Sequence, residues 1–226
     1  MAEVNKDLRA LELLEIEILD LLNSNKILNQ LYFGGGTMLR LCHNLNRYST
    51  DLDFWVTENV DYKKIFSSIE RLLSPSYNLI DSQNKFYSLL FQIKSPTSKR
   101  SLNIEIRKEQ SNFEWERKIA FSRYTTKQVQ LNGLTLRQMM KNKISALISR
   151  KIIRDCFDID FLLKRGIPIE GEKETLLKML EIIKSFKEKD FKVTLGSVLD
   201  SGEREFYNEN KFNFLQQEII AKLSSH

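Results

Sequence analysis

Residues 34–56 constrain the fold of this chain most, because glycines, a helix-like segment and an acidic alternating segment follow one another there. The stretch reads Gly-Gly-Gly-Thr-Met-Leu-Arg-Leu-Cys-His-Asn-Leu-Asn-Arg-Tyr-Ser-Thr-Asp-Leu-Asp-Phe-Trp-Val. Glycines let backbone N–H groups approach a phosphate closely, and a helix that begins just behind them adds a favourable dipole. We therefore predict an anion site, with Gly35 and Gly36 lending their backbone and Thr37 contacting a triphosphate oxygen. Glycine clusters often form only turns, and the acidic segment that follows is what favours phosphate binding.

The acidic segment carries Asp51 and Asp53, which are separated and followed by apolar residues. On a strand, both carboxylates would share one face while the apolar side chains pack inward. Carboxylate oxygens suit magnesium, which usually keeps waters and takes substrate phosphates as further ligands. In the loop before the strand, Arg47 is placed to meet a phosphate and Ser49 to fix the loop by local hydrogen bonds. A phosphate cradle beside a metal pair indicates phosphoryl or nucleotidyl transfer.

A third carboxylate follows on another predicted strand. Residues 86–94 and 102–107 predict a hairpin joined by the turn-rich residues 95–101. In its second strand, Asn103, Glu105 and Arg107 alternate with apolar residues, so Glu105 lies on a polar face. Two-metal nucleotidyl transfer uses such a carboxylate to activate the attacking hydroxyl. The alternative for Glu105 is a solvent-facing strand charge.

Elsewhere, apolar residues at helical spacing predict helices over residues 8–22, 65–73, 176–186 and 212–223. Residues 128–134, with Asn132-Gly133 as a turn, predict a short hairpin. We assign no role to residues 113–123.

A charged block lies in the helix predicted from Leu136 onward. If this helix is continuous, four charged residues fall within one sector beside apolar residues: Lys143, Arg150, Arg154 and Asp158. A charge run of this kind is usually a solvated face, and the shared apolar sector is what favours a functional role. A break at residues 152–153 would instead move Asp155 toward a helix N-terminus, where an acid is favoured by ~0.3 to 1 kcal/mol.

Two motifs resemble a known family. Phe-Gly-Gly-Gly-Thr, followed by Arg-Tyr-Ser-Thr-Asp-Leu-Asp-Phe, resembles the first motif of the AbiEii/AbiGii-type nucleotidyltransferases. These include the MenT toxins of bacterial toxin–antitoxin systems and belong to the polymerase-beta-like nucleotidyltransferase superfamily. Residues 143–158 resemble the family's Lys-x-x-Ala-Leu-x-x-Arg followed by Arg-Asp-x-x-Asp. The two motifs bracket more than half of the chain.

The resemblance implies a metal-dependent enzyme that uses a nucleoside triphosphate (NTP) with Mg²⁺ or Mn²⁺. The superfamily commonly has Asp at the third acidic position, so Glu105 is a longer substitute. Lys143 would contact the triphosphate, and Asp155 and Asp158 would belong to the active-site rim. The expected site residues are then of three kinds: catalytic Asp51, Asp53, Glu105, Lys143, Asp155 and Asp158; nucleotide-binding Gly35, Gly36, Thr37, Arg47, Ser49, Lys143 and Arg150; and metal-binding Asp51, Asp53 and Glu105.

The resemblance also suggests a phage-defence toxin that transfers a nucleoside monophosphate (NMP) to RNA, at the 3′ end of tRNA, and is restrained by a cognate antitoxin. One alternative keeps the chemistry but changes the acceptor to a small molecule or a protein. Another is an inactive member of the fold that only binds a partner, for which Glu105 in place of Asp is the one supporting departure.

Composition bounds these readings. The 226 residues are 42% hydrophobic with 8 Gly and 3 Pro, which favours a folded, helix-rich chain. Lys plus Arg exceeds Asp plus Glu by 35 to 30, which permits a nucleic-acid partner without requiring one. We read neither a signal peptide nor a membrane span, and expect a cytoplasmic protein. The predicted class is α+β: a small mixed-sheet nucleotidyltransferase lobe with flanking helices at residues 1–133, and a helical C-terminal lobe at residues 134–226 that completes the active-site cleft.

Overall fold

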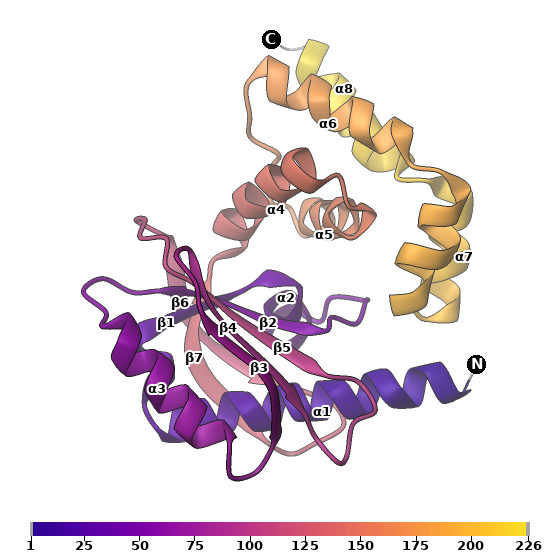
Figure 1. The fold of residues 1–226 in the computed structure, drawn as a ribbon. Helices are drawn as coiled ribbons and strands as arrows, with labels where there is room; N and C mark the ends of the chain where they lie inside the picture. The colour runs from indigo at the N-terminus through magenta and orange to yellow at the C-terminus, as the bar shows by residue number, and fades with distance from the viewer. Residues whose placement is uncertain (1, 225–226) are drawn as a thin grey trace. The chain divides into compact units, whose positions relative to one another are not determined.

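The computed structural model describes residues 2–224, with side chains from residue 6 onward. The chain divides into two compact units, Met1–Leu134 and Thr135–His226 (Figure 1). Among the described residues, no helix is long and apolar enough to cross a membrane.

The N-terminal unit contains a seven-stranded sheet and its covering helices. Its elements are α1 (Ala2–Ser24), the 3₁₀ helix η1 (Ile27–Gln30), β1 (Leu31–Gly34), α2 (Gly35–His43), β2 (Asp51–Val56), α3 (Tyr62–Leu73), β3 (Asn78–Asn84), β4 (Ser88–Lys94), β5 (Leu102–Arg107), β6 (Trp115–Phe121) and β7 (Gln128–Leu134).

The sheet is mixed, with the strand order β3-β4-β5-β2-β1-β7-β6. Strand β2 pairs in parallel with β5, and β1 pairs in parallel with β7, while the other neighbours are antiparallel. A mixed sheet with helices confirms the predicted α+β class. The β4–β5 hairpin predicted over residues 86–107 is also present.

The alternation in β2 sorts its side chains onto two faces, as the sequence pattern predicts. Leu52 and Phe54 are fully buried. Phe54 packs against Phe33 of β1, with ring centroids 5.1 Å apart. On the same apolar side of the sheet, Phe91 of β4 stacks on Phe66 of α3 at 5.0 Å. Helix α3 therefore covers the apolar face at β3 and β4, and the aspartates of β2 lie on the opposite face of the sheet.

The prediction of a short hairpin over residues 128–134 is wrong. These residues form the single strand β7, and Asn132 and Gly133 lie inside it, paired with Arg117 and Glu116 of β6. Glycine is required at 133 for close approach rather than for a turn, since a Cβ there would lie 2.7 Å from Cγ of Lys118. The strand that pairs with β7 is β6, which lies within residues 113–123, the segment to which we assigned no role.

The C-terminal unit is helical throughout its regular elements. They are α4 (Leu136–Arg150), α5 (Ile153–Lys164), α6 (Lys173–Ser185), the π-helix η2 (Asp190–Leu195), the 3₁₀ helix η3 (Gly196–Val198), α7 (Ser201–Asn210) and α8 (Asn213–Ser224). Helix α4 ends at Arg150, the next residue, Lys151, has a left-handed φ of 54°, and α5 starts at Ile153. The helix is therefore broken, and Asp155 lies in the first turn of α5.

Candidate active site

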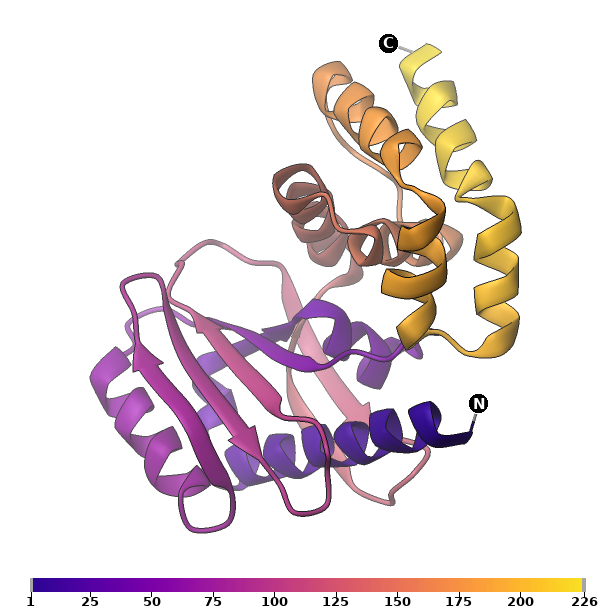
Figure 2. The ribbon, with the colours of Figure 1, turned by 45° about the vertical axis from the view of Figure 1, so that its right-hand side comes forward.

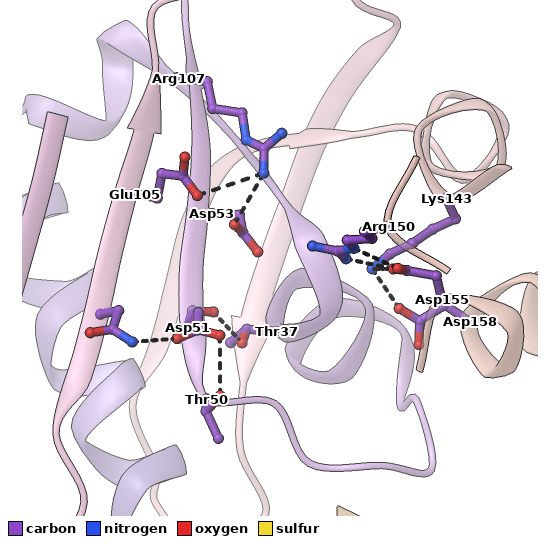
Figure 3. Close-up of polar contacts among 11 residues, drawn as sticks. Thr37, Thr50, Asp51, Asp53, Glu105, Arg107, Lys143, Arg150, Asp155 and Asp158 are labelled. Carbon is purple, nitrogen blue, oxygen red and sulfur yellow. Dashed lines mark hydrogen bonds and ion pairs between the residues drawn. The ribbon is translucent and has the colours of Figure 1, made fainter. Parts of the chain in front are cut away.

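The acidic face of the N-terminal unit is set by the register of two parallel strands. Asp51 of β2 lies opposite Asn103 of β5, and Asp53 lies opposite Glu105. Residues directly opposite on neighbouring strands point to the same face of a sheet. The register therefore brings all three predicted carboxylates to one face (Figure 3).

The start of α2 lies directly against this face. Gly34 of β1 pairs with Asp53, so the helix begins beside that carboxylate. Gly35 has a φ of +72°, and a Cβ there would lie 2.1 Å from Oδ2 of Asp53. Both the left-handed backbone and the close approach require glycine.

Arg47 lies at the same helix start. A Cβ on Gly36 would lie 2.4 Å from Nη2 of Arg47 and 2.9 Å from Oγ of Ser49, so both side chains pack onto this glycine. The Arg47 side chain is buried, and its Nη1 donates to the Tyr48 carbonyl at 2.9 Å. The loop before β2 thus places a cation at the N-terminus of a helix, where the dipole favours an anion.

Hydrogen bonds fix the position of Asp51. Its backbone carbonyl accepts from Oγ1 of Thr37 at 2.6 Å, and Thr37 is fully buried. Its carboxylate accepts from Nδ2 of Asn103 at 2.8 Å and from Oγ1 of Thr50 at 3.1 Å. Thr37 therefore links α2 to the acidic strand, which sequence reasoning did not foresee.

Arg107 is a member of the acidic face that the sequence analysis did not assign to the site. Its Nη2 lies 3.6 Å from Oε2 of Glu105 and 4.0 Å from Oδ1 of Asp53. Its guanidinium also lies over the ring of Trp55, 5.1 Å from the centroid. The alternation that placed Glu105 on the polar face also places Arg107 there, so this pattern was the available signal.

The chemistry of this face suits a divalent cation. Its carboxylate oxygens are the ligands that Mg²⁺ prefers. The carboxylates of Asp53 and Glu105 both approach one guanidinium, so the space between them favours positive charge. Among the described residues, no three His, Cys, Asp or Glu side chains converge closely enough to hold one metal ion. By the type of their donor atoms, these carboxylates fit the metal. In this structure Asp51 accepts hydrogen bonds from Thr50 and Asn103, and Asp53 forms an ion pair with Arg107.

The C-terminal unit gathers the second predicted group into a buried ion-pair cluster. Nζ of Lys143 on α4 lies 2.6 Å from Oδ2 of Asp158 and 3.2 Å from Oδ1 of Asp155 on α5. Arg150 adds two bonds of 2.6 Å to the Asp155 carboxylate, from Nε and Nη2. The side chains of Lys143, Asp155 and Asp158 are at most 8% exposed. The cluster therefore ties α4 to α5 across the helix break (Figure 3).

A mixed sheet that carries carboxylates on neighbouring strands, beside a glycine-rich helix start, is the architecture of a nucleotidyltransferase. The chain belongs to the family of AbiEii nucleotidyltransferase toxins of type IV toxin–antitoxin systems, whose family model matches residues 18–222. It is therefore an NTP-dependent nucleotidyltransferase, and its family implies an antitoxin partner.

Solved structures share the fold. The chain is similar to MenT4, the nucleotidyltransferase toxin Rv2826c from Mycobacterium tuberculosis H37Rv, with a TM-score of 0.61 and 17% identity over 95% of this chain and 85% of that one. It is also similar to JHP933 from Helicobacter pylori, with a TM-score of 0.55 and 16% identity over 100% of this chain and 97% of that one. At such identities the likeness shows the fold alone. No curated protein sequence matches the chain.

Proposed function

We propose that this chain transfers NMP from an NTP to the 3′-terminal hydroxyl of an RNA, with tRNA as the substrate class, and so acts as a phage-defence toxin. The observation that carries the proposal is the register of β2 with β5, which places Asp53 beside Glu105 and on the same face as Asp51. Family membership supports the chemistry. We place the activity in the cytoplasm, since NTPs and tRNA are found there.

Asp51, Asp53 and Glu105 would hold Mg²⁺ or Mn²⁺. A bound divalent cation would neutralise charge on the triphosphate and lower the pKa of the acceptor hydroxyl. Arg107 supports this assignment, because its contacts with Asp53 and Glu105 keep both carboxylates turned toward one space.

Glu105 is the residue we assign to the acceptor. Its carboxylate accepts the proton of the attacking hydroxyl while the acceptor oxygen forms a bond to the α-phosphorus. The bond from that phosphorus to the bridging oxygen breaks, and pyrophosphate leaves with the electron pair. Such catalysis depends on positioning the reactants and on stabilising charge at the phosphate.

The start of α2 is the part we assign to the triphosphate, through Gly35 and Gly36 and with Arg47 and Ser49 beside them. The Arg47 side chain supports this, because it packs against Gly36 and adds positive charge at the end of the helix where the dipole already favours an anion. Contacts of Thr37, Lys143 and Arg150 with the triphosphate stay predictions. So do the rim position of Asp155 and Asp158 and the completion of a cleft by residues 134–226.

The acceptor class rests on charge and on the surface near Glu105. The net charge of +5 favours a polyanion over a cationic small molecule. An RNA acceptor must also leave a free hydroxyl close to Glu105, whose side chain is 35% exposed.

The test is incubation of the purified chain with each α-labelled NTP, Mg²⁺ and total RNA, beside Asp51→Ala and Asp53→Ala. We expect label on a tRNA-sized band, reduced at least about a hundredfold in both variants because each loses a metal-binding carboxylate. Thr57→Ala, just outside β2, is the matched control. Label on protein or on a small molecule, with none on RNA, would overturn the RNA acceptor, and no label anywhere would favour an inactive binding-only protein.

A further inference from the structure

The hairpin that joins β3 to β4 exposes two adjacent aromatic side chains at its tip. Phe86 is 84% exposed and Tyr87 is 80% exposed, more than any other large hydrophobic side chain in the part of the chain whose side chains are described. Their rings lie 4.7 Å apart at an angle of 84°. Single exposed hydrophobic residues are common, but these two rings pack edge to face and form one contiguous apolar patch, in which each ring keeps an outer face open to a ligand.

The tip, residues 85–87, is held firmly in place. The backbone N–H of Lys108 donates to the Tyr87 carbonyl at 2.9 Å, and the N–H of Lys85 donates to the Ser88 carbonyl at 2.9 Å. Nζ of Lys108 donates to Oδ1 of Asn84 at 2.7 Å and also to the Lys85 carbonyl. The two rings are therefore presented on an anchored turn, so that ordering them on binding a ligand costs little conformational entropy.

The tip shares a cavity with the acidic face. Phe86 and Tyr87 line a cavity of about 570 Å³ together with Glu105 and Arg107 of β5. Ser88, the first residue of β4, pairs with Arg107, the last residue of β5. This pairing places the tip of the β3–β4 hairpin at the end of β5 (Figure 2). A cavity of this size lies within the range that takes a ligand such as a nucleoside. A group seated on the rings therefore lies next to the carboxylate that we assign to the acceptor hydroxyl.

The groups around the cavity select one kind of ligand. Planar aromatic faces stack on unpaired nucleobases whatever their sequence, and cationic side chains nearby attract the phosphate backbone. Arg107 and Lys108 supply such cations at the wall of the cavity, which the carboxylates of Glu105 and Glu109 also line. An apolar protein surface would find these charges unfavourable in an interface core, where charged residues are depleted.

We propose that Phe86 and Tyr87 form a stacking platform for an unpaired nucleobase of the RNA acceptor, close to the 3′-terminal hydroxyl presented to Glu105. This inference rests on the proposed function, and it names how the acceptor is held. Stacking on the rings needs an unpaired base with an accessible face, so the platform suits a single-stranded RNA end rather than a duplex and reads no sequence.

The experiment measures binding of a 5′-fluorescein single-stranded RNA with a free 3′ hydroxyl, by anisotropy at fixed salt and without NTP. Three double variants are compared: Phe86→Ala with Tyr87→Ala, Phe86→Leu with Tyr87→Leu, and Phe86→Tyr with Tyr87→Phe. Phe214→Ala, which removes a partly exposed ring from α8, is the matched control. The exposure of both tip residues means that these changes leave the fold intact, which circular dichroism checks.

We expect the alanine and leucine pairs to weaken RNA binding at least about fivefold, since one stacked base contributes roughly fivefold or more to the affinity. The ring-exchanged pair and Phe214→Ala should bind RNA as the parent does, and NTP affinity should not change. Unchanged RNA affinity in the alanine pair would overturn the platform. This holds even if that pair loses binding to the antitoxin, since the rings would then contact the antitoxin and not the RNA. Lost NTP affinity would overturn it too, since the rings would then hold the incoming nucleotide.

The same proteins separate this inference from the proposed function. If the alanine pair labels RNA with the parent's KM for the acceptor, the platform is wrong and the transferase function stands. If the alanine pair binds RNA weakly while the parent transfers no nucleotide to any RNA, the platform stands and the proposed function is wrong.

Discussion

At the residue scale, Gly35 joins the helix start to the acidic strand. An alanine there would adopt a disfavoured left-handed backbone and press its Cβ against the Asp53 carboxylate. We expect Gly35→Ala to lower the free energy of unfolding by about 1–3 kcal/mol. It should also reduce nucleotide transfer at least about tenfold, which urea titration and the label assay measure.

Gly202→Ala is the matched control for this substitution. Apart from its chain neighbours and the backbone of its own helix, no described heavy atom lies within 4 Å of a Cβ built on Gly202, in the first turn of α7. This change should be neutral or stabilise by about 0.5–1 kcal/mol. Equal behaviour of the two alanine variants would contradict the role given to Gly35.

Glu15 on α1 makes a second residue-scale prediction, about pH. It is buried, and its Oε1 has no hydrogen-bond partner among the described residues. Burial, and then the neighbouring Glu12, raise the pKa of Glu15 well above its usual value. The folded state keeps the proton while the unfolded chain releases it near its ordinary pKa. Stability is therefore present below that pKa and lost as pH rises toward the folded pKa.

Glu15→Gln should remove this loss. The gain in melting temperature over the parent should be small at pH 5 and larger at pH 8, as thermal unfolding at both values measures. Glu17→Gln, an exposed neighbour on the same helix, should show no such trend. A gain that is equal at both pH values would contradict the burial argument.

At the element scale, the break between α4 and α5 is held by buried charge. Lys143→Ala would leave Asp155 and Asp158, whose side chains are at most 1% exposed, without their ammonium partner. Losing one partner of a buried ion pair costs about 3–5 kcal/mol. Urea unfolding should show that loss. Lys184→Ala, at an exposed position near the end of α6, should cost no more than about 1 kcal/mol.

A Lys143→Ala protein as stable as its parent would contradict the structural role of the cluster. The same variant tests the resemblance to the family. If Lys143 also contacts the triphosphate, NTP affinity should fall more than unfolding at the assay temperature explains.

The elements also show what sequence patterning can and cannot predict. Strand β2 was predictable because its apolar residues alternate with aspartates, and the β4–β5 hairpin because turn residues separate two alternating runs. Strand β3 is an edge strand with mostly exposed polar side chains, so it carries no burial pattern. Its role depends on pairing with β4, which is tertiary information. The helix break after α4 likewise depends on a left-handed Lys151, a conformation that no residue type there signals.

The side of the sheet on which the candidate site residues lie could be predicted, because successive side chains of a strand alternate between its two faces. That rule placed Asp51, Asp53 and Glu105 correctly on one side of the sheet. It could not show the parallel pairing of β2 with β5, which makes Asp53 and Glu105 neighbours, because the pairing joins segments about fifty residues apart. Nor could it show that Thr37 donates to the backbone of Asp51.

At the scale of the whole molecule, the acidic face should need metal for activity but not for folding. Thr50, Asn103 and Arg107 already hold its carboxylates through hydrogen bonds and ion pairs. Removing divalent cations with EDTA should abolish nucleotide transfer and leave the melting temperature unchanged. Excess Mg²⁺ or Mn²⁺ should restore activity. A large fall in melting temperature on chelation would instead indicate a structural metal.

The central claim is nucleotidyl transfer at the acidic face, and paired labelling tests it most directly. The parent chain, Asp51→Ala and Asp53→Ala are each given RNA with NTP labelled at the α-phosphate or at the γ-phosphate. Transfer of NMP retains the α-label on RNA and releases the γ-label as pyrophosphate. We predict label on RNA from the α-labelled NTP only, and only with the parent. Label on RNA from the γ-labelled NTP, or α-label that persists in both variants, would contradict the account.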